Sequence, residues 1–139
     1  MNLSRIALAA LGAFVVYFVV GGIAFGVFPS LRTEFLKYPA VYRSQEGIKS
    51  VMPVGMAAMF VGMVVLAVLY AMQYQAGSAV AGGARFGALI GVFAICAFVV
   101  HNYVDQNIGG KLTLQQAVAC LVEWIVTGIV IGLIYRPVR

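Results

Sequence analysis

The chain has 139 residues, of which 63% are hydrophobic and 9% are charged, and its nine Lys and Arg residues against four Asp and Glu residues give a formal net charge of +5. A soluble domain carries about 25% charged residues, so this composition argues against an ordinary soluble domain and indicates a bilayer as the solvent. The basic residues are scattered at the edges of apolar segments, which argues against nucleic-acid binding.

Four apolar segments are each long enough to cross a bilayer. They run over residues 6–28, 53–73, 83–103 and 113–135. At about 1.5 Å per residue, each segment reaches the ~30 Å hydrocarbon core. The first run is longer than the about 7–15 residues of a signal-peptide core, so it is expected to stay as a helix. The sequence predicts an all-α integral membrane fold, with one domain over residues 1–139, four antiparallel transmembrane helices, and an interfacial segment between helices 1 and 2.

Helix 1 has Tyr17 at its centre and a Gly22-x-x-x-Gly26 pair near its end. Because such a pair lets a second helix approach closely, it is expected to serve helix packing.

The connection over residues 29–51 mixes charged and aromatic side chains, as is typical of the headgroup zone. Residues 30–37 are expected to form a short interfacial helix that Pro39 stops, and residues 42–50 a second short piece that leads into helix 2. Two interpretations stay open. The connection either anchors the chain on the lipid surface, or it covers a cleft or docks a partner.

Helix 2 carries four methionines along one face. Methionine is a flexible packing residue, and the stripe is typical of helix packing. Thioether ligation of a soft metal such as Cu(I) is the alternative. The stripe consists of Met52, Met56, Met59 and Met63.

Helix 3 follows a short connection rich in small residues and carries Gly83, Gly87 and Gly91 at four-residue steps. On a regular helix these glycines lie within about 80° of arc. His101 falls on the same arc, and so does Asp105 if the helix continues that far. The spacing therefore predicts a smooth glycine groove that leads to a polar end. A turn with two glycines then makes helices 3 and 4 a hairpin.

Helix 4 presents two different faces. Gly128 and Gly132 lie on one face, more than about 90° from the centre of a polar stripe on the other. We expect the stripe to look toward the glycine groove of helix 3 and toward Tyr17, and the two glycines to look toward a different neighbour. The stripe spans about 60° of arc and consists of Gln116, Cys120, Glu123 and Thr127.

Glu123 is a carboxylate near the middle of a membrane span. A charge there costs at least about 2.5–3.5 kcal/mol, so the group is expected to face protein or water. No basic residue lies at its depth in the sequence. Protonation, or neutral donors such as the Tyr17 phenol, is therefore predicted in place of a salt bridge.

A polar intramembrane line follows from these positions and has three interpretations. It is hydrogen-bonding between helices, or a path for protons or a small solute, or a pigment or haem site with His101 as ligand. The first is favoured, and no cofactor is predicted. The line consists of Asp105, His101, Gln116, Glu123 and Thr127, with Tyr17 beside it.

Two patterns in the second half of the chain resemble those of small four-span bacterial membrane proteins of unknown function. Helix 3 starts with GxRFGxxIG over residues 83–91, and helix 4 ends with VExxxxGxxxGxIYRP over residues 122–137. The resemblance implies a four-span architecture in a bacterial inner membrane. It carries over no catalytic residue.

Three glycine-bearing faces, on helices 1, 3 and 4, exceed what one hairpin needs, so one face is expected to serve another chain. The leading hypothesis is an interaction protein: a homo-oligomer or an accessory subunit of a larger membrane complex. The alternatives are a transporter or channel subunit that moves protons or a small solute via Glu123 and His101, and a membrane enzyme acting on a lipophilic substrate. An even number of spans puts both termini on one side, and the short, acid-free flanks favour the cytoplasm.

Overall fold

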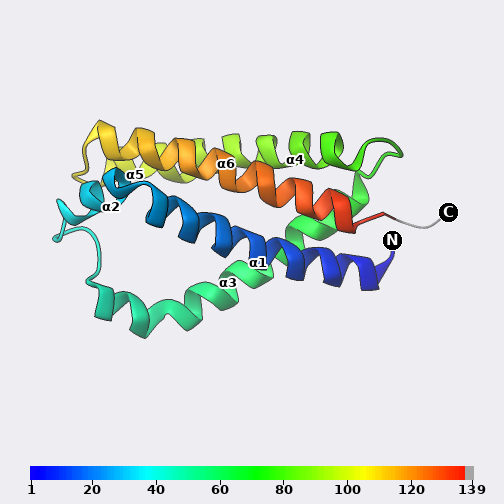
Figure 1. The fold of residues 1–139 in the computed structure, drawn as a ribbon, viewed down its shortest axis with the longest axis horizontal. Coiled ribbons are helices and arrows are strands. Elements are labelled where there is room, and N and C mark those ends of the chain that lie inside the picture. Colours follow the sequence, from blue (N-terminus) through cyan, green and yellow to red (C-terminus); the bar gives the residue numbers. More distant parts are fainter. Residues whose placement is uncertain (137–139) are drawn as a thin grey trace.

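The computed structural model describes residues 1–136, and helices make up most of them (Figure 1). Residue Pro137 of the C-terminal pattern lies outside the described residues. The elements are α1 (Leu3–Val27), α2 (Pro29–Leu36), α3 (Gln45–Met72), α4 (Ala79–Ala94), a π-helical turn η1 (Ile95–Val99), α5 (Val100–Asp105) and α6 (Gly110–Ile134).

Within the described residues, four helices are long and apolar enough to cross a membrane, which confirms that part of the prediction. Because α4, η1 and α5 follow one another without a break, they form one continuous helix, which is one of these four. Their length and composition suggest a multi-pass membrane protein. The candidate spans are Leu3–Val27, Gln45–Met72, Ala79–Asp105 and Gly110–Ile134.

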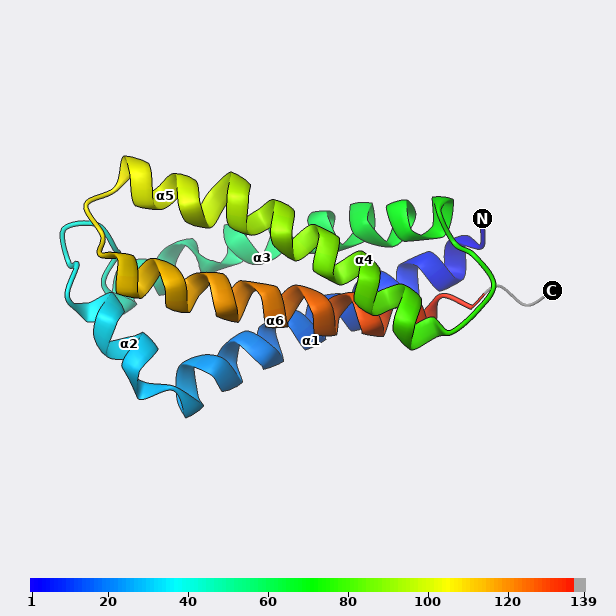
Figure 2. The same ribbon diagram turned by 90° about the horizontal axis from the view of Figure 1, so that it is seen from above.

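Helix α6 is the central helix of the bundle. It packs along α4 on one side and α1 on the other, while α3 packs mainly against α1 (Figures 1 and 2). The start of α1 is joined to the end of α6 by a hydrogen bond of 3.3 Å from Arg5 Nη1 to the carbonyl oxygen of Ile134. The N-terminus and the α3–α4 loop therefore lie at one end of the molecule. The α2–α3 loop and the α5–α6 turn lie at the other (Figure 1).

The main apolar core lies toward the end that holds the N-terminus. Alanines on α1 and α3 let these helices approach closely. All of the buried residues of α3 come from its second half, and its first half diverges from α1 (Figure 1). The core consists of Ile6, Ala9, Ala10, Ala13, Met63, Ala67, Tyr70, Ala71, Phe86, Ile131 and Tyr135.

Helix α3 begins at Gln45, eight residues before the predicted span, and continues through Pro53. The start is set by Ser44, whose hydroxyl accepts a hydrogen bond of 3.2 Å from the amide of Gly47. Glu46 in the first turn is favourable beside the positive end of the helix dipole. The predicted second short piece of the connection is therefore the first part of α3.

The π-helical turn η1 changes the face that α5 presents. An inserted residue rotates everything after it by about 100° relative to a regular helix. Ala94, just before the turn, is buried, whereas α5 has no buried residue. The expectation that His101 and Asp105 lie on the same helix face as Gly83, Gly87 and Gly91 is therefore wrong. That expectation assumed a regular α-helix throughout.

Candidate functional site

Helices α4 and α6 meet through glycines on both helices. A Cβ built at Gly83 would lie 2.8 Å from the Cα atom of Ile129, and one built at Gly128 would lie 2.7 Å from the Cα atom of Gly87. A Cβ at Gly132 would lie 3.1 Å from the Cα atom of Gly83. Such distances leave no room for a side chain, so the two backbones are in direct contact.

The polar stripe of α6 faces α1, and the expectation that it faces the glycine groove is wrong. The groove is filled by the glycine face of α6, because backbone contact needs small residues on both helices. On the α1 side, a Cβ built at Gly21 would lie 2.8 Å from Oε1 of Glu123. The two faces of α6 do look toward different neighbours: Glu123 of the stripe lies on the side of Tyr17, as expected, whereas Gly128 and Gly132 face α4.

The Glu123 carboxyl lies half-buried against the backbone of α1 at Gly21. The Tyr17 phenol, one turn earlier on α1, lies near it. The Tyr17 ring also packs on Trp124, with 5.2 Å between ring centroids. Within residues 1–136 the ion pairs of Lys and Arg involve Glu34 and not Glu123. In the described part of the chain, this carboxyl therefore has no basic partner.

The other members of the predicted polar line lie in separate places. Gln116 Nε2 donates a hydrogen bond of 3.2 Å to the hydroxyl of Tyr42, so it is tied to the α2–α3 connection. His101 Nε2 lies 3.3 Å from Asp105 Oδ2, and both side chains are more than 60% exposed. Thr127 is buried, and its hydroxyl has no hydrogen-bond partner among the described residues. The structure brings Glu123 together with Tyr17, and it leaves His101 with Asp105 on α5.

The methionine stripe of α3 does not converge on one site. Met63 is fully buried in the core, whereas Met52 and Met56 are 47% and 39% exposed. Met59 packs partly against the core. Because α3 diverges along its first half, the four thioethers meet different surroundings.

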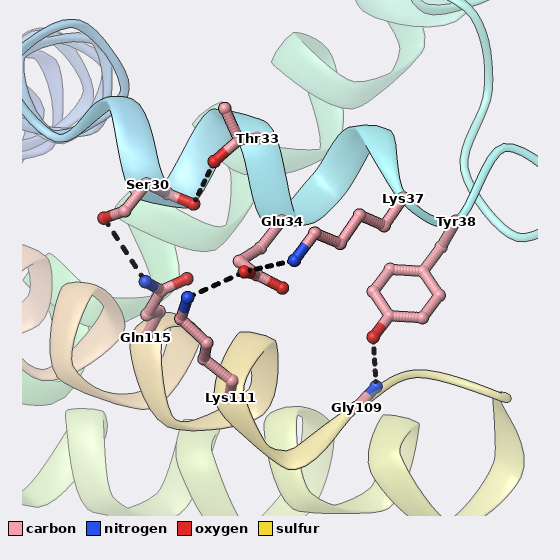
Figure 3. Close-up of polar contacts among 8 residues, drawn as sticks. All are labelled: Ser30, Thr33, Glu34, Lys37, Tyr38, Gly109, Lys111 and Gln115. Carbon is pink, nitrogen blue, oxygen red and sulfur yellow. Dashed lines mark hydrogen bonds and ion pairs between the residues drawn. The ribbon is translucent and has the colours of Figure 1, made fainter.

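A second polar site, which the sequence analysis missed, joins α2 to the start of α6 (Figure 3). Glu34 is only 4% exposed, and its Oε1 lies 2.7 Å from Lys37 Nζ and 2.8 Å from Lys111 Nζ. Just beyond α2, the hydroxyl of Tyr38 accepts a hydrogen bond of 2.9 Å from the amide of Gly109. Leu31 and other apolar residues of this region pack on Ile108 and Leu112 beneath these polar contacts.

These contacts shift the ionisation of the charged groups at the second site. Hydrogen bonds from Lys111 and then Lys37 hold the pKa of the Glu34 carboxyl below its ordinary value of 4.5. The hydrogen bond to Glu34 raises the pKa of the Lys37 ammonium above its ordinary value of 10.5. The sequence holds one sign of this site. The turn before the last helix has one basic residue, Lys111, and this turn lies at the same end of the molecule as the connection over residues 29–51.

The fold and these two sites define a class: a small helical protein with four candidate membrane-spanning helices and an amphipathic segment docked at one end. No protein-family model, curated protein or solved structure matches the chain.

Proposed function

We propose that the chain is a small integral membrane protein of the bacterial inner membrane that works through contacts with other chains. It acts as a homo-oligomer or as an accessory subunit of a larger complex. Its four long helices cross the bilayer in antiparallel order, α2 lies at the headgroup level, and both termini face the cytoplasm. The placement of successive loops at opposite ends of the molecule supports the antiparallel order (Figure 1).

One observation supports the proposal: the glycine pair of α1 has no packing partner among residues 1–136. A Cβ built at Gly22 or Gly26 would meet no atom of a neighbouring element within 4 Å. The glycines of α4 and α6 are in contact with each other, so in the described residues the pair on α1 is the remaining GxxxG face. In a bilayer, such a face lets another helix approach to backbone contact.

The test is the mass of the protein extracted in a gentle detergent. We expect wild-type protein to run as an assembly well above the single-chain mass of 14.8 kDa. The Gly22→Leu, Gly26→Leu double variant should lose that assembly. Gly55→Leu is the matched control, because Gly55 is an exposed glycine of α3 with nothing within 4 Å. Wild-type protein that is monomeric and brings no partner with it would contradict the proposal.

A second candidate is movement of protons or a small solute through Glu123. The observation in its favour is a carboxyl in the middle of an apolar helix with Tyr17 as its polar neighbour. His101 lies with Asp105 on exposed α5, so this candidate rests on Glu123 and Tyr17 alone. Glu123→Gln keeps the shape of the side chain and removes its ionisation. Proton flux into liposomes that is the same for this variant and the wild type would exclude the candidate.

A further inference from the structure

A cavity of about 510 Å³ lies between α1, α2 and α6. Its volume falls in the range of about 300–1,000 Å³ that ligand pockets have. The walls are mostly aliphatic, with Val20 and Ala24 from α1 and Val118 and Val122 from α6. Ser30 and Gln115 are the polar side chains of the lining. An apolar ligand would therefore find a suitable wall along most of this space.

The polar side chains lie at the α2 end of the cavity. Gln115 and Val122 are seven residues apart on α6, which corresponds to about 10 Å along the helix axis. Gln115 Nε2 donates a hydrogen bond of 3.3 Å to the hydroxyl of Ser30, as drawn in Figure 3. The other atom of the same amide, Oε1, is buried and has no hydrogen-bond partner among the described residues. Because Oε1 is closed to solvent, it is also closed to a ligand in the cavity, and the amide serves to hold Ser30.

The same end of the cavity carries an excess of positive charge. Lys111 lies one turn before Gln115 on α6, and its ammonium shares Glu34 with Lys37 (Figure 3). Two ammonium groups on one carboxylate leave a net charge of +1. The Lys111 side chain is 68% exposed, so its charge remains accessible from outside.

We propose that this cavity binds an anionic phospholipid such as phosphatidylglycerol. One acyl chain fills the aliphatic part between α1 and α6. The phosphate lies beside the Lys111 ammonium at the polar end. Helix α2 covers the polar end through Ser30. The inference rests on insertion of the chain in a bilayer, and it does not depend on assembly through Gly22 and Gly26.

The test counts lipids on the full chain by native mass spectrometry. The protein is reconstituted with equal amounts of phosphatidylglycerol and phosphatidylcholine of matched acyl chains, and is then released into a gentle detergent. We expect one retained phosphatidylglycerol per chain, with a preference of about fivefold, the factor expected for one lysine beside an anionic headgroup. Lys111→Gln should remove the preference, and Lys111→Arg should keep it.

The cavity itself is tested by filling it. Ala24→Phe should reduce the retained lipid to the background level, because a ring would occupy the space of the acyl chain. Ile23→Phe is the matched control, since Ile23 is the neighbouring residue, is exposed, and does not line the cavity. Ala119→Phe fills the cavity from α6 and serves if the α1 variant does not fold.

Two results would overturn the proposal. The first is equal retention of the two lipids by wild-type protein. The second is unchanged lipid retention by a folded cavity-filled variant. If Ala24→Phe instead dissolves an assembly while no lipid is seen on wild-type protein, a second copy of the chain occupies the cavity, and the lipid proposal fails. The oligomer mass comes from the same spectra, so failure of the lipid site and failure of assembly are distinguished.

Discussion

Three helices of this chain carry glycines at four-residue spacing, yet these glycines stand in two kinds of surroundings. Those of α4 and α6 press on each other's backbone, whereas the pair on α1 has nothing within 4 Å. The four-residue spacing therefore indicates a face that a second helix can approach. Which faces meet is decided by the rest of the fold. The glycines are Gly83, Gly87 and Gly91 on α4, Gly128 and Gly132 on α6, and Gly22 and Gly26 on α1.

The largest effect is expected from adding a methyl group at the contact of α4 with α6. In Gly87→Ala the new Cβ would lie 2.8 Å from the Cα atom of Ile125 and 2.9 Å from the carbonyl carbon of Trp124. Backbone atoms cannot turn aside, so the helices must separate. We expect a loss of about 3 kcal/mol in the free energy of unfolding, at the upper end of overpacking effects. Reversible unfolding by a denaturing detergent in mixed micelles measures this loss. An unchanged midpoint would contradict the close backbone contact of α4 with α6.

The next largest effect is expected at the end of the molecule where ion pairs, and not glycine contacts, hold α2 against α6. Glu34→Gln removes the carboxylate that Lys37 and Lys111 share. We expect hydrogen–deuterium exchange in residues 29–38 to rise several-fold, with α4 and α6 unchanged. Glu46→Gln is the control, because Glu46 is an exposed acid at the start of α3. Equal exchange in the two variants would show that Glu34 does not hold α2.

The same contact sets a pH dependence with a definite sign. The folded pKa of Glu34 is lowered, so its contribution is complete above the ordinary value of 4.5 and is lost as pH falls through the lowered value. The folded pKa of Lys37 is raised, so its contribution is complete below 10.5 and is lost as pH rises through the raised value. The protection of the α2 amides, which is their exchange rate relative to the intrinsic rate at the same pH, should therefore be greatest at neutral pH and fall at both extremes. A profile in Glu34→Gln that keeps the acid limb would contradict this assignment.

A smaller effect is expected where α1 meets the Glu123 carboxyl. In Gly21→Ala the new Cβ would lie 2.8 Å from Oε1 of Glu123, which is the movable end of a side chain. The carboxyl can rotate away, although it would leave its place beside Tyr17. We expect a loss of about 1 kcal/mol that disappears in a Glu123→Ala background, as a double-mutant cycle measures for groups in contact. Additive single effects would show that the two residues do not touch.

Hydrophobic length made the four long helices predictable from sequence, because the bilayer-sized apolar runs dominate the composition. The arrangement of faces was not predictable in the same way. The turn η1 leaves no mark in the hydropathy of residues 95–99, yet it moves His101 and Asp105 off the predicted arc. Buried Glu34 pairs with Lys111, which is far away in sequence, so no local sequence pattern indicates that this carboxylate is buried.

The smallest expected effect has the opposite sign and uses the same substitution as the largest. Gly62 lies within α3, and a Cβ built there would meet no atom of a neighbouring element within 4 Å. Gly62→Ala therefore adds no clash and removes conformational freedom from the unfolded chain. Alanine should stabilise this helix interior by about 0.5–1 kcal/mol. The unfolding assay used for Gly87→Ala measures it. A destabilisation would mean that this face of α3 is in contact with another chain, and that α1 does not carry the remaining glycine surface alone.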